Sequence, residues 1–124
     1  MQRYLTDRKR ADGLGSGRHG THHHWHMMMT SLALVVVVPV FLVTFLAGFG
    51  GTYAEVVAYF SQPIPAIIVA LSLIVTISHV TSEAVVAVED YVHGARGKLL
   101  IIGLNWFSYI LIAVGLFAIA RMAL

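Results

Sequence analysis

The 124-residue chain has no cysteine, and its charged residues make up only 11% of the composition. Without cysteine there are no disulfides, thiolate metal sites or cysteine-ligated iron-sulfur clusters, so any metal must be held by histidine or carboxylate. The formal net charge of only +2 argues against nucleic-acid binding. Hydrophobic residues account for 58% of the chain, which is more than so small a soluble domain can bury. The composition therefore indicates a membrane protein.

Three apolar stretches are long enough to cross the roughly 30 Å hydrocarbon core as helices. The predicted spans are residues 27–49, 64–91 and 99–121. Helices are expected despite the β-branched run 35–38, because an open strand leaves its peptide groups unpaired in lipid. Pro39 is expected to kink the first helix, and Gly103 and Gly115 to let a neighbouring helix approach the third. The predicted fold class is an all-α integral membrane protein.

Residues 1–26 form a basic, histidine-rich arm in front of a membrane domain of residues 27–124. The arm holds five of the eight Lys and Arg residues, whereas the first loop, 50–63, holds none. By the positive-inside rule the amino terminus is cytoplasmic. Asp7 and Asp12 are atypical of a mitochondrial presequence, which favours a bacterial inner membrane.

His79 is an ionisable residue inside the second predicted span, where such residues need a partner or a function. Glu83 and Asp90 lie about 40° and about 20° around the helix from it, and Asp90 lies about 16 Å further along the axis. A buried imidazole suits haem iron, and two from facing helices give a six-coordinate electron-transfer haem. No other histidine lies at this depth, so a second ligand would come from another polypeptide or a second copy. Alternatively, His79 only forms a hydrogen bond with a helix neighbour or with Glu83.

Asp90 and Tyr91 place a carboxylate beside a phenol at the membrane boundary. Tyr91 can donate a hydrogen bond to a quinone carbonyl, and Asp90 can orient it or relay a proton. The alternative is an aromatic-belt tyrosine and a boundary carboxylate near Arg96 or Lys98. A different function is also open, a small transporter or channel subunit that uses Glu83 and Asp90 as proton or cation sites.

The histidines at 22–26 raise the question of a zinc or copper site. Four nearly consecutive histidines cannot all face one ion on a helix. An interfacial segment in which Trp25 and several imidazoles lie at headgroup depth is therefore favoured.

The pattern as a whole resembles a known family. His79 is followed after ten residues by Asp90 and Tyr91, the arm ends in Gly20-Thr-His, and Thr30 enters the first span. These features resemble the hydrophobic membrane anchor subunit, the smaller of two, of bacterial succinate dehydrogenase. The resemblance covers nearly the whole chain.

The resemblance implies that His79 is an axial ligand of haem b, with the second ligand supplied by a companion cytochrome b anchor subunit in a shared helical bundle. It implies that Tyr91 hydrogen-bonds ubiquinone on the cytoplasmic side, with Asp90 beside that site and the iron-sulfur subunit nearby. A flavoprotein subunit with FAD would oxidise succinate, and the iron-sulfur subunit would pass electrons to the quinone. The chain would then be a non-autonomous subunit of the enzyme.

The sequence departs from the family pattern at two positions. Many relatives have an arginine two residues before the threonine of the first span, often assigned to a haem propionate, where this chain has Met28. Propionate pairing would then fall to His22, other arm histidines or the partner. Relatives also often have glycine four residues after the haem histidine, where this chain has Glu83.

Overall fold

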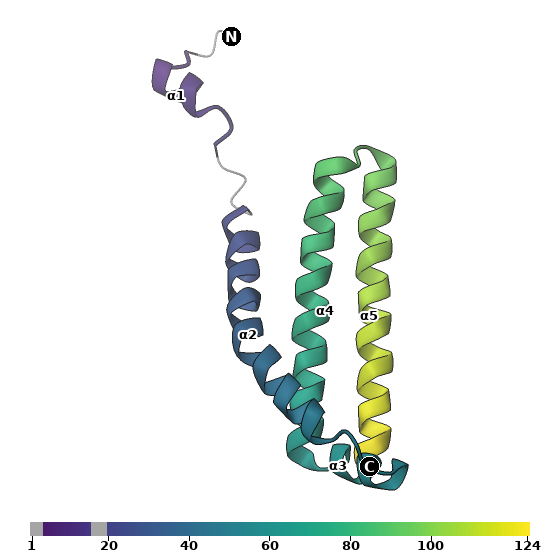
Figure 1. Ribbon diagram of the computed structural model, residues 1–124. Coiled ribbons are helices and arrows are strands. Elements are labelled where there is room, and N and C mark those ends of the chain that lie inside the picture. The colour runs from purple at the N-terminus through teal and green to yellow at the C-terminus, as the bar shows by residue number, and fades with distance from the viewer. Residues whose placement is uncertain (1–3, 16–19) are drawn as a thin grey trace.

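The structure, a computed structural model, describes residues 4–15 and 20–124, and the regular secondary structure of these residues is entirely α-helical. Three long helices form its body (Figure 1): α2 (Gly20–Ala47), α4 (Pro63–Tyr91) and α5 (Ala95–Ala123). Each is long and apolar enough to cross a membrane. The predicted all-α fold with three spans is confirmed. Arg3, Arg18 and His19 of the arm lie outside the described residues.

Two of the long helices begin earlier than predicted. α2 begins at Gly20 rather than near residue 27, and α5 begins at Ala95 rather than at residue 99. The prediction followed hydropathy, which falls where the chain leaves the hydrocarbon core, whereas helical backbone bonding continues into the polar interface. The histidines at 22–26 are therefore helical. The arm also contains a short helix, α1 (Asp7–Asp12), capped by the Thr6 side chain.

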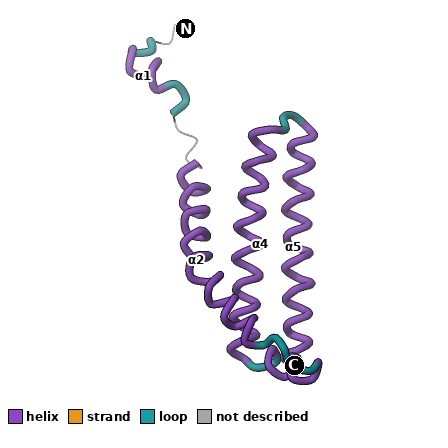
Figure 2. The backbone as a smooth tube through the Cα atoms, viewed as in Figure 1, coloured by secondary structure: helices purple, strands orange, loops and turns teal. Residues whose placement is uncertain are grey.

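α4 is the central helix of the bundle. It lies between α2 and α5 and packs against both (Figures 1 and 2). Because the long helices alternate in direction, the beginning of α2, the end of α4 and the beginning of α5 lie at one end of the bundle. We call this the arm end.

Prolines and glycines shape the helix contacts. Pro39 lies inside α2, which bends along its length as expected where a residue lacks an amide hydrogen (Figure 2). A Cβ added at Gly115 of α5 would overlap the Leu73 side chain of α4, so the predicted close approach is confirmed there. A Cβ at Gly103 would meet no atom of the described chain within 4 Å. Of these two glycines of α5, only Gly115 therefore serves packing against another helix of the described chain.

A short helix that the sequence analysis did not predict, α3 (Tyr53–Phe60), fills the loop at the opposite end. Thr52 caps its first turn, and the Glu55 carboxylate accepts a hydrogen bond from the Thr52 backbone amide at 2.7 Å. The hydrogen bonds from the backbone and side chain of Thr52 lower the pKa of Glu55. The Tyr59 hydroxyl donates to the carbonyl oxygen of Thr44 at 2.8 Å and so ties α3 to the end of α2.

The chain has almost no core of its own. Its accessible surface is 9988 Å², against about 6,500 Å² for a soluble monomer of this mass. Among the described residues no large side chain is fully buried, and the buried apolar side chains are those of the small residues Pro65 and Ala66. The apolar faces of the long helices therefore need lipid or another polypeptide to cover them.

Several small polar side chains inside the spans form hydrogen bonds within their own helices. Ser72 donates to the carbonyl of Ile68, and Asn105 donates through Nδ2 to the carbonyl of Ile101. Such bonding lets a polar residue remain in lipid without a partner on another helix. His79 is bonded differently.

Candidate functional site

His79 lies in the second half of α4, and 17% of its side chain is exposed. Its Nδ1 lies 3.0 Å from Oγ1 of Thr30 on α2. Its Nε2 lies 3.8 Å from a carboxylate oxygen of Glu83, one turn further along α4, and 55% of the Glu83 side chain is exposed. The imidazole is thus held by the neighbouring helix on one side and faces an exposed carboxylate on the other.

The Thr30 contact decides where a metal bound to His79 must lie. A porphyrin cannot fit on the Nδ1 side, because the two helices touch there through a hydrogen bond of ordinary length. A histidine of α2 therefore cannot face His79 across an iron. The Nε2 side is therefore the side left for a metal, and Glu83 lies 3.8 Å away there.

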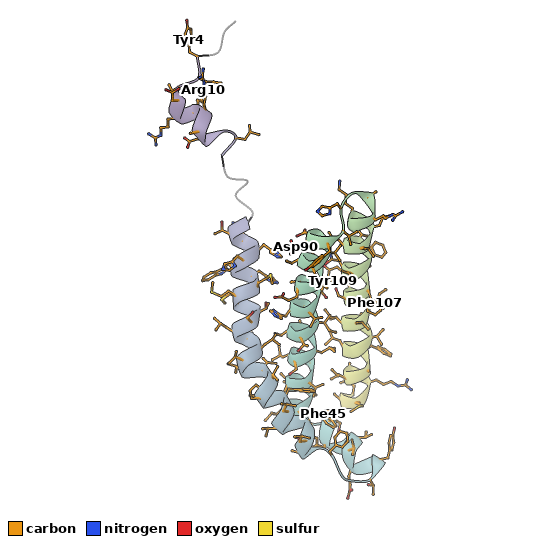
Figure 3. All side chains as sticks on the ribbon, turned by 45° about the horizontal axis from the view of Figure 1, so that its top comes forward. Tyr4, Arg10, Phe45, Asp90, Phe107 and Tyr109 are labelled. Atoms are coloured by element: carbon orange, nitrogen blue, oxygen red, sulfur yellow. The ribbon has the colours of Figure 1, made fainter. Side chains whose placement is uncertain are left out.

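Asp90 and Tyr91 end α4 at the arm end, where Figure 3 labels Asp90. Both residues are exposed, Tyr91 to 85%. Among the described residues no ion pair joins Asp90 to Arg96 or Lys98. Because α4 is continuous from His79 to Tyr91, the predicted rise of about 16 Å between His79 and Asp90 is retained.

His22 lies in the first turn of α2 and is exposed. Helical geometry places it about 80° around α2 from Thr30, whereas His23 and His26 lie only about 20° and about 40° away. Of the arm histidines in the described part of the chain, these two follow the face of α2 that meets His79. In the described residues no group of three or more histidine and acidic side chains lies close enough to hold a metal ion.

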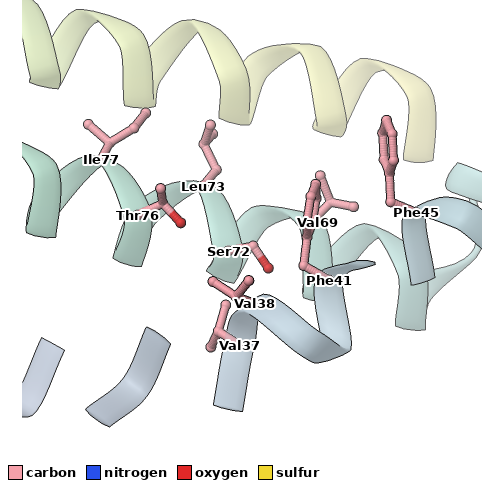
Figure 4. Close-up of a pocket in the computed structure, with 9 residues that line it drawn as sticks. All are labelled: Val37, Val38, Phe41, Phe45, Val69, Ser72, Leu73, Thr76 and Ile77. Atoms are coloured by element: carbon pink, nitrogen blue, oxygen red, sulfur yellow. The ribbon is translucent and has the colours of Figure 1, made fainter. Parts of the chain in front are cut away.

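Apolar grooves lie near His79 along α4, but His79 does not line them. The larger, of about 310 Å³, lies between α2 and α4 on the side away from the arm end (Figure 4). It is lined by Val37, Val38, Phe41, Phe45, Val69, Ser72, Leu73, Thr76 and Ile77. Its walls offer apolar side chains and two hydroxyl groups. They suit an acyl chain or an apolar side chain better than a charged group.

Comparison with known proteins identifies the family. The family model described as succinate dehydrogenase/fumarate reductase transmembrane subunit matches residues 2–119. The succinate dehydrogenase hydrophobic membrane anchor subunit of Paracoccus denitrificans is 39% identical over 122 residues, which cover 98% of this chain and 95% of that protein. No solved structure matches. The chain belongs to the family of succinate dehydrogenase and fumarate reductase transmembrane subunits.

Membership of this family confirms the predicted function as a membrane anchor subunit of succinate dehydrogenase. The chain is a multi-pass membrane protein and part of an oxidoreductase complex with further subunits. The transporter or channel alternative based on Glu83 and Asp90 is not favoured.

Sequence reasoning missed the contact between Thr30 and His79. It used Thr30 only as a family marker, although a threonine beside a mid-span histidine is a chemically suitable partner. No periodicity within either helix shows that the two residues meet, because they are 49 positions apart and belong to different helices.

Proposed function

We propose that this chain supplies one axial ligand, His79, to a haem b that it shares with a companion cytochrome b anchor subunit. The observation that carries this proposal is the orientation of His79 within the span. Its Nδ1 is occupied by Thr30, while its Nε2 faces only the exposed carboxylate of Glu83. Imidazole nitrogen is a suitable axial ligand for haem iron, so the donor fits the group. A haem bound there supplies one-electron transfer.

Glu83 is compatible with this role because its side chain can turn away from His79. At 3.8 Å the contact with Nε2 is too long for a hydrogen bond, and more than half of the Glu83 side chain is exposed. Ligation of iron by Nε2 would therefore displace a weak contact. The neighbouring subunit must cover this side of α4.

We propose in addition that Tyr91 and Asp90 contribute to a ubiquinone site at the arm end. In the described residues the Tyr91 hydroxyl forms no hydrogen bond within the chain and is free to donate to a quinone carbonyl. Asp90 lies beside it with no basic partner in the described chain. The histidines at 22–26, His22 among them, lie at the same end and are available to a haem propionate.

The arm end would face the cytoplasm of a bacterium, with the three helices in the inner membrane. The arm carries most of the basic residues, and Arg96 and Lys98 lie at the same end, as the positive-inside rule requires. Tyr91 would then lie on the side where an iron-sulfur subunit delivers electrons taken from succinate by the FAD of a flavoprotein subunit.

The visible spectrum of the purified complex tests the haem assignment. His79→Ala should abolish or severely reduce the low-spin b-type bands, because a porphyrin with one lost axial ligand is no longer six-coordinate. His93→Ala is the matched control, since His93 is exposed and follows the end of α4. Intact haem bands in His79→Ala would show that His79 is not the ligand.

A further inference from the structure

We infer that Thr30 is a positioning residue, which holds the His79 ring so that Nε2, and not Nδ1, carries the lone pair directed at the iron. This inference rests on the proposed haem function and concerns how the ligand is prepared. The contact joins α2 to α4 at 3.0 Å between Thr30 Oγ1 and His79 Nδ1.

The Thr30 hydroxyl has a single proton, and the acceptor to which it donates that proton decides the direction of this hydrogen bond. Oγ1 lies 3.0 Å from the carbonyl oxygen of Met27 and 3.1 Å from that of His26, both in its own helix. A hydroxyl has one proton and two lone pairs. If that proton is shared with the helix carbonyls, Oγ1 can only accept from His79, so the proton of the neutral ring is on Nδ1.

The opposite arrangement is less favourable. If Thr30 donated to Nδ1, the ring proton would be on Nε2, which lies 3.8 Å from the carboxylate oxygen of Glu83. That distance is too long for a hydrogen bond. Iron ligation by Nε2 also requires that this nitrogen has no proton. Nδ1–H then needs an acceptor in a largely buried position, and Thr30 is the acceptor in place.

A hydrogen bond from Nδ1–H of a metal-bound histidine has two effects. It fixes the rotation of the ring, and it makes Nε2 more basic, which strengthens the bond to the metal. A more basic axial ligand stabilises ferric over ferrous haem and lowers its reduction potential. Thr30 should therefore tune the haem and not merely join two helices.

The test compares three substitutions in the complete complex. Thr30→Val keeps the shape of the side chain and removes the hydroxyl, whereas Thr30→Ser keeps the hydroxyl. Ser31→Ala is the matched control, because the Ser31 hydroxyl bonds only to the carbonyl of Met27 in its own helix. The measurements are the haem midpoint potential by redox titration and the g values of the ferric haem by electron paramagnetic resonance.

We expect the midpoint potential of Thr30→Val to shift to a more positive value and its g values to change, while Thr30→Ser and Ser31→Ala stay close to the wild type. The inference is overturned if Thr30→Val matches the wild type, if Ser31→Ala shifts equally, or if serine fails to restore the wild-type values. Should the valine variant not assemble, Thr30→Ala removes the hydroxyl without adding bulk, and the same shift is expected. A wild-type complex without haem would instead contradict the proposed function itself.

Discussion

At the scale of single residues, the cost of polar groups in lipid explains how the site is built. An unpaired ionisable side chain at the centre of a span costs roughly 2.5 kcal/mol or more. His79 offsets this cost by bonding to Thr30, and Glu83 by lying on an exposed face where solvent or a partner subunit can meet it. The His79 ring is thus hydrogen-bonded at Nδ1, whereas Nε2 has only a long contact with Glu83.

Tyr91 gives a residue-scale prediction. Tyr91→Phe removes the phenolic hydroxyl that would donate to the quinone and leaves the ring unchanged. We expect succinate–quinone reductase activity to fall about tenfold or more, because the loss of one hydrogen bond between neutral groups raises the activation free energy by about 1.4 kcal/mol. Succinate oxidation by an artificial acceptor should be unchanged, because that reaction does not use the quinone site.

The control for Tyr91 is Tyr53→Phe. Tyr53 is equally exposed, at 86%, but lies on α3 at the opposite end of the bundle. If Tyr53→Phe slows quinone reduction as much as Tyr91→Phe, or if Tyr91→Phe slows both assays equally, Tyr91 does not belong to the quinone site.

At the scale of helices, α4 determines the position of the site because it packs against both other spans. Its contact with α2 brings Thr30 to His79, and its contact with α5 depends on the absence of a side chain at Gly115. Small residues allow helices in lipid to approach closely, where van der Waals contact replaces the missing hydrophobic driving force.

Gly115 gives a helix-scale prediction. Gly115→Val would force the Leu73 side chain out of its place and should destabilise the assembled complex by about 1–3 kcal/mol, the usual range for overpacking. Gly103→Val carries the same helix-propensity cost, but a Cβ at Gly103 meets no atom of the described chain within 4 Å. Thermal unfolding of the detergent-solubilised complex should show a lower midpoint for Gly115→Val than for Gly103→Val. Equal midpoints would mean that the contact of Gly115 with α4 contributes nothing.

At the scale of the whole molecule, the chain is an incomplete bundle. Large apolar side chains are exposed along all three spans, among them Leu32, Ile74 and Phe107. Lipid can cover much of this surface. Lipid offers no axial ligand, so a haem at His79 needs a second polypeptide on the Nε2 side of α4.

The need for a second polypeptide can be tested by expressing the chain without the companion anchor subunit. The chain alone should insert into the membrane but show no six-coordinate b-type haem, and co-expression of the companion should restore the spectrum. Optical spectra of isolated membranes, with the amount of chain measured by immunoblot, provide the comparison. A six-coordinate haem in membranes that contain only this chain would mean that a second copy supplies the other ligand.

The sequence by itself determined the features that depend on one helix at a time. The three spans follow from apolar length, and the relation of His79 to Asp90 follows from the fixed rise and rotation of an α-helix. The ends of α2 and α5 were predicted less well, because hydropathy marks the edge of the hydrocarbon and not the end of backbone hydrogen bonding. α3 was missed because its signal, the capping box of Thr52 and Glu55, lies in a loop that has no long apolar run.

Only the tertiary structure decided which residues of different helices meet. The rotation of each helix against its neighbour decides these contacts. It determines that Thr30, and not a histidine of α2, faces His79, and that Gly115, and not Gly103, contacts α4. In a chain with almost no core, that rotation is set by a few close contacts between helices, which no pattern within a single helix records. The sequence identifies His79 as a candidate ligand, but only the packed bundle shows that Thr30 contacts it.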